Sequence, residues 1–434
     1  MDTPWPVCAR LTRITVKKET AEVSLTVPGD PEPLLLAGPP ADAGVMGEIE
    51  HSGGSYEPHV MRALGRLIGR DAVVFDVGAN IGVFALVMSR LAPGGQVFAF
   101  EPATENFDYL EKNLVANGAG NVVAERCAVY DESGTVPFVL SPASPSGSFV
   151  SPGGGHAGES QPVEAVSMDD YVEGRGLSRV DLIMVDAEGA EMAVLHGAAR
   201  TLRKFRPALL VEVNPVSLRR FGGASFRELV EVLRQGGTLF SITEGGLPAR
   251  IATDRHLELL LREEGVVDVL CLPDGHPART LAATARGRRE RLRLEAAFND
   301  RAPPDNNFVV EPSFALGPPP EPVEGLPDHV VWLTLEIRNT SPYWYSSDFL
   351  YHPVHLCYRW VTDDGGQLDV IANRGRFETP LAPGATSTVK IAVRLPKAPG
   401  EYRLALTMLQ ESFAWFDDLD PSLRLMLTGT AALP

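Results

Sequence analysis

The stretch "AVVFDVGANIGVFAL", residues 72–86, decides the fold. An apolar run leads into Asp76. Gly78, Asn80 and Gly82 then follow at alternate positions, and apolar residues resume after them. A short apolar run before a glycine turn is typical of a buried strand that feeds a helix. Glycine lets the backbone approach a ligand closely, and asparagine tolerates left-handed conformations. The stretch therefore predicts a strand, a ligand-facing turn and a helix.

The same alternation of short apolar runs and helix-length segments continues from residue 56 to about residue 272. Further strands are expected at 96–102, 121–129, 181–189, 208–214, 238–245 and 266–273. Helical patterns lie between them, at 103–118, 190–205 and 224–237. This order predicts an α/β fold with a mostly parallel sheet and helices on both faces.

The composition describes a core-forming protein of two or three domains, with 434 residues and 44% apolar side chains. The net charge of −17 disfavours nucleic acid as a partner, since non-specific binding to it needs basic patches. The four cysteines form no CxxC pair, so neither a zinc site nor a disulfide framework is indicated. We find no leader-like N-terminus and no transmembrane run, and we expect a cytoplasmic protein.

The composition also suggests boundaries along the chain. Residues 1–55 are expected to be a lead-in of weakly alternating strands ending in a proline-rich loop, and 56–275 the α/β domain. Residues 276–327 read as a basic helix and a Pro-rich linker, and 328–434 as an immunoglobulin-like β-sandwich of about seven strands. Within the α/β domain, 141–160 is too rich in Ser, Pro and Gly for a packed element and is either a lid or a disordered insertion.

The basic helix carries a cluster of arginines that has two interpretations. They could touch an anionic surface or polymer, or form the solvated face of a helix that braces two domains. We favour the solvated face. The cluster consists of Arg286, Arg288, Arg289, Arg291 and Arg293.

The ends of the first two strands indicate the ligand. Asp76 at the glycine turn would repel a pyrophosphate, and the G-x-G-x-x-G pattern of dinucleotide sites is missing. Glu101 ends the next strand, about 20 residues beyond the glycine turn, where an acid binds ribose hydroxyls. An adenosine without phosphates beside acidic residues points to S-adenosylmethionine, a sulfonium cation.

The strand at 181–189 ends in a second group of acids. In an extended strand Asp186 and Glu188 would lie on one side, facing the transferred methyl group, an acceptor hydroxyl or a divalent metal. The alternative is that one of them caps the helix beginning near Ala190. Methyl transfer to an alcohol needs a group that removes a proton. We therefore take Asp186, Glu188 and Glu212, which ends the adjacent strand, as catalytic candidates.

Several fragments together resemble the FkbM-type O-methyltransferases, which are class I S-adenosylmethionine-dependent enzymes. The resemblance covers roughly residues 45–245. It is carried by "SYEP" (55–58), "VFDVGANIGVFAL" (74–86), "VFAFEPATENFDYLEKNL" (97–114), "CAVYDESG" (127–134), "VSMDDY" (166–171) and "DLIMVDAEGAEMAVLHGAARTL" (181–202).

The resemblance implies a class I methyltransferase fold, related to the Rossmann fold, and a set of cofactor-binding residues. Glu101 would hold the ribose and Asn106 would lie near the adenosine. Ala128 would flank the adenine, and Tyr56 and Glu57 would close over the cofactor. The amino acid and ribose would be lined by Asp76, Gly78, Asn80 and Gly82. In one departure, the lysine usual two residues before the acid of the fourth strand is Met184 here.

Rival enzymes are less well supported. Asn214 and Pro215 suggest a nucleobase methyltransferase, but no aromatic residue follows to stack on an extruded base. A nicotinamide oxidoreductase would need the absent glycine fingerprint. His196 sits in a helical pattern and reads as structural, while His156 could reach a substrate only from the 141–160 loop.

The C-terminal aromatics could stack on sugar rings or fill the sandwich core, and the core is favoured. They are Tyr343, Trp344, Tyr345, Trp360 and Trp415. The stretch "APGEYRLALTMLQESFAWF" (398–416) loosely resembles sandwich domains of sugar-modifying and polysaccharide export proteins. It implies a glycan partner, self-association or association with glycan-assembly enzymes.

The sequence thus predicts an O-methyltransferase acting on a hydroxyl of a sugar, glycan or natural-product intermediate. Two alternatives stay open. One is a glycan-binding or scaffold protein with a degenerate methyltransferase domain, and the other is an N-methyltransferase acting on a small molecule or nucleobase.

Overall fold

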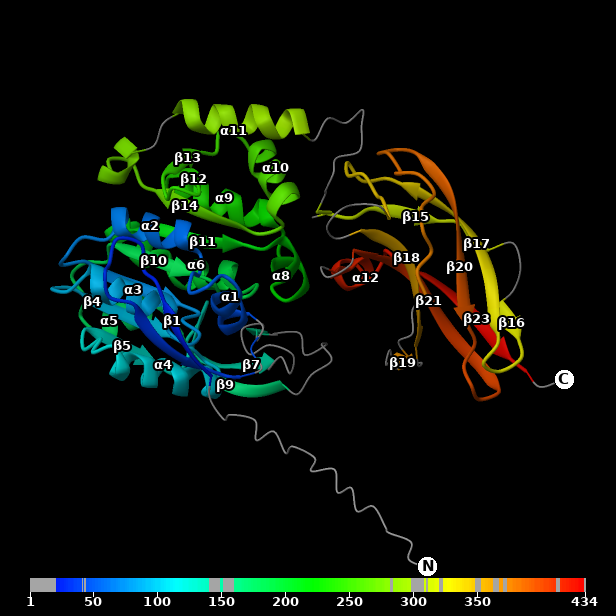
Figure 1. Cartoon of the computed structure of the whole chain (residues 1–434), viewed down its shortest axis with the longest axis horizontal. Helices are drawn as coiled ribbons and strands as arrows, with labels where there is room; N and C mark the ends of the chain where they lie inside the picture. Colours follow the sequence, from blue (N-terminus) through cyan, green and yellow to red (C-terminus); the bar gives the residue numbers. More distant parts are fainter. Residues whose placement is uncertain are drawn as a thin grey trace, which may run out of the picture.

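The computed structural model shows an α/β part followed by a β-sandwich (Figure 1). No helix among the residues described is long and apolar enough to cross a membrane. The described residues are 21–40, 42, 44–139, 149–150, 160–281, 284–297, 308–309, 311–319, 323–347, 353–361, 367–369, 373–410 and 414–432.

An eight-stranded mixed sheet forms the centre of the α/β part, in the order β13-β12-β14-β11-β10-β3-β4-β5. Its strands are β3 (Val73–Val77), β4 (Gln96–Phe100), β5 (Val122–Glu125), β10 (Leu182–Val185), β11 (Ala208–Val213), β12 (Thr238–Ile242), β13 (Pro248–Arg250) and β14 (Val267–Leu272). Neighbouring strands from β5 to β11 are parallel, whereas β14 is antiparallel to both β11 and β12. This confirms the predicted Rossmann-like class. The strand order reverses between β3 and β10, and open α/β sheets bind ligands at such a switch point.

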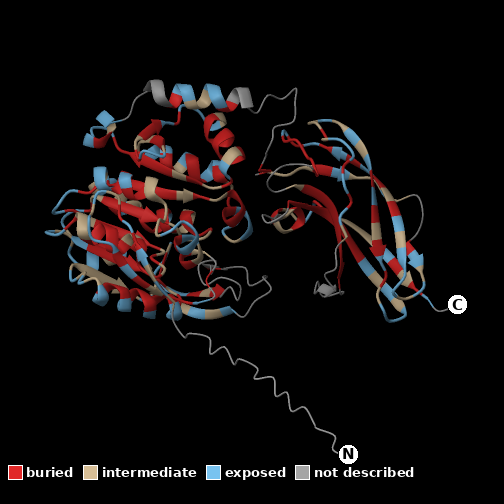
Figure 2. Cartoon of the chain, viewed as in Figure 1, coloured by how far each residue is buried: buried red, intermediate tan, exposed pale blue. Residues whose placement is uncertain are grey.

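Helices cover both faces of this sheet and bury two apolar layers (Figure 2). One face packs against α2 (Pro58–Leu67), α3 (Val83–Leu91) and α4 (Thr104–Ala116), and the other against α5, α6, α9 and α10. The remaining helices are α1 (Val45–His51), α5 (Met168–Gly174), α6 (Glu191–Gly197), α7 (Ala199–Phe205), α8 (Pro215–Arg220), α9 (Phe226–Gly236), α10 (Asp254–Glu264), a 3-10 turn (Pro277–Leu281) and α11 (Thr284–Ala297).

Two segments of the α/β domain differ from the sequence prediction. Residues 121–129 form β5 and the start of a separate strand, β6 (Ala128–Tyr130), which joins a second sheet in the order β6-β9-β7-β8. The predicted helix over 190–205 is two helices, α6 and α7. They are separated at Ala198, which has φ −103° and ψ 6°, and Gly197 before it lies against another backbone: a Cβ there would be 2.1 Å from the carbonyl oxygen of Tyr130.

The second sheet borders the serine-, proline- and glycine-rich loop. Most of 141–160 lies outside the described residues, so neither interpretation of that loop is tested. The other strands of this sheet are β7 (Gly134–Val139), β8 (Phe149–Val150) and β9 (Ser160–Ser167).

The N-terminal lead-in packs onto the α/β domain. β1 (Ala21–Leu25) and β2 (Leu34–Gly38) form an antiparallel pair, so the loop expected up to residue 40 is wrong at "LLLAG". Leu34 and Leu36 are buried in the layer that α2 to α4 cover, and this burial turns the apolar run into a strand. The side chains of Asn113 and Asn117 on α4 hold the β2 backbone by hydrogen bonds.

The C-terminal part is a sandwich of two sheets. The strands are β15 (Phe314–Leu316), β16 (Val323–Gly325), β17 (Val330–Asn339), β18 (Val354–Val361), β19 (Gln367–Asp369), β20 (Thr386–Arg394), β21 (Gly400–Gln410), β22 (Ala414–Trp415) and β23 (Leu425–Ala431). Strands β15-β17-β20 form one sheet and β16-β23-β21-β18-β19 the other, with β22 beside β21. The Trp360 indole donates a hydrogen bond to the Arg394 carbonyl, 2.8 Å away, and joins the two sheets. The short edge strands raise the number above the expected seven.

The two parts of the chain meet at several points. Helix α12 (Phe416–Leu419) of the sandwich contacts α8, and Arg220 of α8 lies 3.7 Å from Asp418. The fully buried Arg262 guanidinium lies 5.1 Å from the centre of the Tyr343 ring. The basic helix α11 packs on α10 and β13, where Arg293 pairs with Glu263.

Candidate active site

A pocket lies at the carboxyl ends of β3, β4 and β10, where the strand order reverses. Seven of the residues singled out from the sequence line it: Gly78, Asn80, Glu101, Asn106, Ala128, Asp186 and Glu188. Asp76, Gly82, Tyr56, Glu57 and Glu212 lie outside that lining. The fold thus brings together residues that are up to 110 positions apart in the chain.

The glycine turn has the backbone that its sequence suggests. Gly78, Asn80 and Gly82 all have positive φ, at 88°, 51° and 94°. A Cβ on Gly78 would lie 1.8 Å from the Asp186 carbonyl oxygen, and one on Gly82 would lie 2.6 Å from a methyl group of Leu110. Both glycines are therefore required by close packing as well as by conformation.

Glu101 ties this turn to the end of β4. Its carboxylate accepts the backbone N–H groups of Asn80 at 2.9 Å and of Ala103 at 2.8 Å. Burial raises the pKa of Glu101 to about 7, although these hydrogen bonds and one from Asn106 act to lower it. The Glu101 carboxylate is thereby held at the pocket wall.

Asp76 is a buried carboxylate with unused hydrogen-bonding capacity. Its Oδ2 has no hydrogen-bond partner among the described residues, and burial raises its pKa to about 7. A hydrogen bond from the Ala85 backbone lowers this pKa and the charge of Glu101 raises it. Met184 stands directly across from Asp76 on β10 and is buried in the apolar layer. The departure from lysine therefore leaves Asp76 without a cation at this neighbouring position.

Asp186 and Glu188 follow β10 in a tight turn. Glu188 has a left-handed φ of 45°, and its Oε2 accepts a hydrogen bond from the Ser217 hydroxyl of α8 at 3.1 Å. The pKa of Asp186 is raised well above its usual value, first by burial and then by the charges of Glu188 and Glu57. The turn thus holds two carboxyl groups at the pocket, and burial raises the pKa of both.

Glu191 shapes this turn, a role that the sequence analysis missed. Its Oε1 accepts the backbone N–H of Ala187 at 3.2 Å and of Gly189 at 3.0 Å, and the residue is buried. The idea that Asp186 or Glu188 caps the helix near Ala190 is wrong, because the N-terminus of α6 has no side-chain cap hydrogen bond; Glu191, its first residue, instead holds the turn that precedes the helix. The sequence "DAEGAE" (186–191) could have indicated this role, because its third acid stands at the start of the helix.

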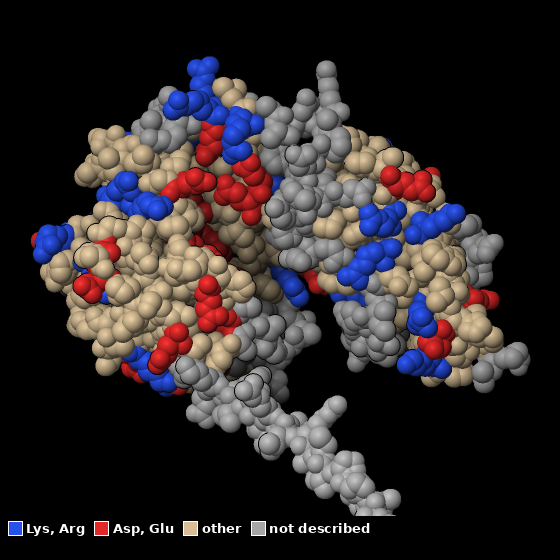
Figure 3. Space-filling view, in the orientation of Figure 1, with Lys and Arg blue, Asp and Glu red and all other residues tan. Residues whose placement is uncertain are grey.

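A second, acidic hollow adjoins the pocket. It is lined by Glu57, His59, Glu212, Ser241, Glu264, Asp268 and Glu290 among others, and Figure 3 shows acidic side chains gathered in the middle of the α/β part. Glu212 stands opposite Asp268 across β11 and β14. Burial and the charge of Asp186 raise the pKa of Glu212 well above its usual value.

Tyr56 and Glu57 lie between α1 and α2, beside this hollow. The Tyr56 ring packs against Phe84, with 5.9 Å between the ring centres. Glu57 has a left-handed φ of 36° directly before Pro58, and such strained conformations concentrate at functional sites. Burial, with repulsion from Asp268, raises the pKa of Glu57 to about 8.

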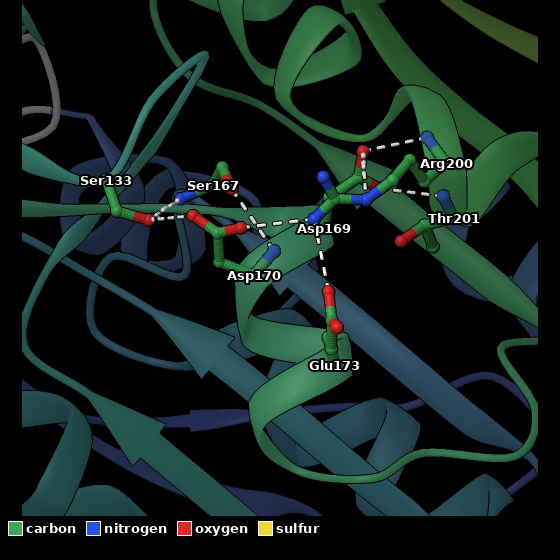
Figure 4. Close-up of polar contacts among 7 residues, drawn as sticks. All are labelled: Ser133, Ser167, Asp169, Asp170, Glu173, Arg200 and Thr201. Atoms are coloured by element: carbon green, nitrogen blue, oxygen red, sulfur yellow. Dashed lines mark hydrogen bonds and ion pairs between the residues drawn. The ribbon is translucent and has the colours of Figure 1, made fainter.

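The "SMDDY" segment, at the start of α5, forms a polar network with α7 and with Ser133 (Figure 4). The buried Asp169 carboxylate accepts the backbone N–H groups of Arg200 and Thr201, each at 2.7 Å. Asp170 accepts from the Ser133 hydroxyl at 2.6 Å. The network holds α5 against α7, and α7 directly follows α6, the helix that begins at Glu191.

The remaining candidates have structural surroundings. Asn214 caps α8, since its Oδ1 accepts the backbone N–H groups of Val216 and Ser217. His196 is exposed on α6, and His156 lies outside the described residues. In the described part of the chain, no group of three or more His, Cys, Asp or Glu side chains is arranged to hold a metal ion.

Comparison with known proteins identifies the domain. The family described as "Methyltransferase FkbM domain" matches residues 76–240. The hexuronic acid methyltransferase AglP of Haloferax volcanii is 31% identical over 189 residues, which span 43% of this chain and 72% of AglP. This chain belongs to the FkbM methyltransferase family.

Two further matches cover a smaller share of the other protein. The methyltransferase sdnD of Sordaria araneosa is 34% identical over 29% of this chain, and the match spans 59% of sdnD. A crystal structure of an FkbM methyltransferase from Methylobacillus flagellatus has a TM-score of 0.30 and 16% identity, covering 47% of this chain and 44% of the other. The family match and the relationship to AglP identify an S-adenosylmethionine-dependent methyltransferase domain, and the sandwich lies beyond residues 76–240.

Proposed function

We propose that the whole chain is an S-adenosylmethionine-dependent O-methyltransferase that modifies a hydroxyl of a sugar, a glycan or a natural-product intermediate. The observation that carries this proposal is the pocket at the switch point, where Asp186 and Glu188 face the glycine turn. Family membership supplies the type of chemistry, and the acids supply the means to accept a proton.

The residues of the pocket fit a cationic adenosine cofactor. Gly78 lines the pocket without a side chain that could fill it, and Glu101 offers carboxylate oxygens to ribose hydroxyls. The free Oδ2 of Asp76 and the neighbouring acids favour a positive ligand over a pyrophosphate. S-adenosylmethionine would supply an activated methyl group on its sulfonium.

Transfer of that methyl group to an alcohol requires alignment and removal of one proton. The fixed turn of residues 186–189 would align the acceptor oxygen, since orientation contributes a large part of such rates. Asp186 is the proposed proton acceptor, with Glu188 and Glu212 as further candidates. The raised pKa of Asp186 makes this carboxylate a stronger base once it is ionised, and a nearby cation favours its ionisation.

The acceptor class is proposed from the relatives. Their names specify a hexuronic acid for AglP, the 31-O position of FK506 for FkbM of Streptomyces tacrolimicus, and 2-O-methylation for NoeI of Sinorhizobium fredii. These names favour oxygen over nitrogen as the atom that receives the methyl group, and a sugar or a natural-product hydroxyl as its carrier.

Calorimetric titration of the full chain with S-adenosylmethionine and with NAD tests the cofactor. Binding of NAD in place of S-adenosylmethionine would refute the proposal. Transfer of a labelled methyl group to a panel of sugars, uronic acids and amines then tests the acceptor, and labelling of amines alone would refute O-methylation. Asp186→Asn and Glu212→Gln should reduce transfer at least about 100-fold if the base is assigned correctly. The control Glu111→Gln, on the exposed side of α4, should have no effect.

A further inference from the structure

The sheet β15-β17-β20 of the sandwich has one face that packs into the sandwich core and one outer face that no other described part of the chain packs against. On β17, Leu333, Leu335 and Ile337 are buried in the sandwich, whereas the side chains between them point outward. Trp332 belongs to this outer set and is 69% exposed. An exposed indole of this extent is unusual, because Trp is highly buried on average.

The strand pairing defines what surrounds Trp332. Ala392 of β20 stands directly opposite it, and its small side chain leaves the ring uncovered. The next outward pair along the strands is Thr334 with Lys390, followed by Glu336 with Thr388. Hydroxyl and charged groups therefore border the indole on one side, and the exposed Val330 lies on the other, opposite Arg394. We call this set, together with Arg338, Thr386 and Arg394, the Trp332 face.

The charge of the Trp332 face is opposite to that of the chain. It carries Arg338, Lys390 and Arg394 against Glu336, while the chain as a whole has a net charge of −17. Arg394 pairs with Asp328 at 3.4 Å. Arg338 and Lys390 form no ion pair with any residue that the structure describes. Lys390 is thus available in the pair next to the indole, and Arg338 lies on the same face about 20 Å farther along the strand, where a ligand that spans several sugar units would reach both.

We propose that the Trp332 face binds a glycan chain that carries acidic groups. The apolar face of a sugar ring stacks on the indole, the threonines bond to sugar hydroxyls, and Arg338 and Lys390 bond to acidic substituents. This role goes beyond methyl transfer and does not depend on the proposed acceptor. Of the aromatics first considered for stacking, Tyr343, Trp344, Tyr345 and Trp360 are buried and Trp415 is half-buried, so Trp332 is far more accessible than any of them.

A second copy of the chain fits this face less well. A stable interface buries about 800 Å² per partner around an apolar centre. Here most side chains around the indole are charged or carry hydroxyl groups, and two copies of a face with three cations and one carboxylate would repel one another. Electrostatic complementarity therefore favours an acidic glycan over self-association.

Fluorescence and calorimetric titration of the full chain tests this site, with oligogalacturonate and hyaluronan oligosaccharides as acidic probes and dextran as the neutral probe. We expect acidic probes to bind more tightly than dextran and to dissociate at high salt. Trp332→Ala should weaken binding at least about tenfold, Trp332→Phe should retain most of it, and Lys390→Gln should weaken acidic probes selectively. Val115→Ala, at an exposed apolar residue of α4, is the matched control and should change nothing.

Several results would overturn the proposal. One is no binding of either acidic probe, and another is equal binding by the wild type and Trp332→Ala. Equal affinity for dextran and for oligogalacturonate would refute the acidic character of the ligand. Concentration-dependent dimers that Trp332→Ala abolishes would assign the face to self-association instead. Because these titrations need no methyl transfer, their outcome is separate from that of the cofactor and acceptor assays.

Discussion

Replacing Glu191 by alanine should release the turn that carries Asp186 and Glu188. The Glu191 carboxylate is buried and accepts the backbone N–H groups of Ala187 and Gly189. In Glu191→Ala both groups lose their acceptor inside the protein. The perturbation therefore acts on the backbone of the catalytic turn without touching either candidate base.

The structure sets the size of this effect. A buried N–H group without an acceptor costs about 1–3 kcal/mol, and the group on Gly189 is buried while that on Ala187 is half-buried. We expect Glu191→Ala to lower the free energy of unfolding by about 2–5 kcal/mol. Misplacement of the turn by about 1 Å should also slow methyl transfer by about 100-fold.

Urea unfolding and amide hydrogen exchange measure the two consequences separately. The amides of Ala187 and Gly189 should exchange at least about tenfold faster in Glu191→Ala, since about 1.4 kcal/mol corresponds to a factor of ten. Unchanged stability together with unchanged protection of both amides would refute the assigned role.

Glu191→Gln is the matched control, because its amide oxygen can accept the same two hydrogen bonds. Burial raises the pKa of Glu191 from 4.5 to about 7, so the folded protein binds this proton more tightly than the unfolded chain. The stability from this proton is complete below pH 4.5 and is lost as the pH rises through about 7. The stability of Glu191→Gln relative to wild type should therefore increase between pH 5 and pH 8, by up to about 3 kcal/mol.

Three further predictions concern the cofactor pocket and its support. Gly78→Ala should abolish S-adenosylmethionine binding in calorimetry, because its Cβ would lie 1.8 Å from the Asp186 carbonyl oxygen; affinity near wild type would contradict the packing argument. Binding of S-adenosylmethionine should strengthen from pH 6 to pH 8, since the pKa of Asp76 is about 7 and its ionised form attracts the sulfonium. Asp76→Asn should flatten this pH dependence of the affinity. An unchanged slope in the variant would exclude Asp76 as the source of the dependence. Asp169→Ala should lower the free energy of unfolding by about 2–5 kcal/mol, because two backbone N–H groups of α7 lose their acceptor, and urea titration measures the loss.

Local sequence patterns predicted the strands and the glycine turn well. "AVVFDVG" becomes β3, and the positive φ values at Gly78 and Gly82 follow from the residue types. The split of 190–205 into α6 and α7 was not predicted, and the close approach of Gly197 to the Tyr130 backbone beside the break joins residues far apart in the chain. The strand at "LLLAG" was missed because prolines on both sides indicated a loop, while burial against α4 decided the outcome.

The residues of the candidate site were likewise predicted only in part. Asp76, Glu101 and Asp186 were predicted from their positions at strand ends, since parallel strands place these ends at one edge of the sheet. Asp268 was missed, although a single acid in the apolar run "VVDVLCL" was a usable signal. Only the antiparallel pairing of β11 and β14 shows that this acid stands opposite Glu212.

By itself, the sequence determined the α/β class, the methyltransferase family and the acids at the strand ends, because each rests on local periodicity or on short motifs. Only the tertiary structure decided which acids share one pocket, that Glu191 shapes the turn of residues 186–189, and that Trp332 is exposed while Tyr343, Trp344, Tyr345 and Trp360 are buried. Burial and pairing depend on residues far apart in the chain, and a one-dimensional pattern does not contain those contacts.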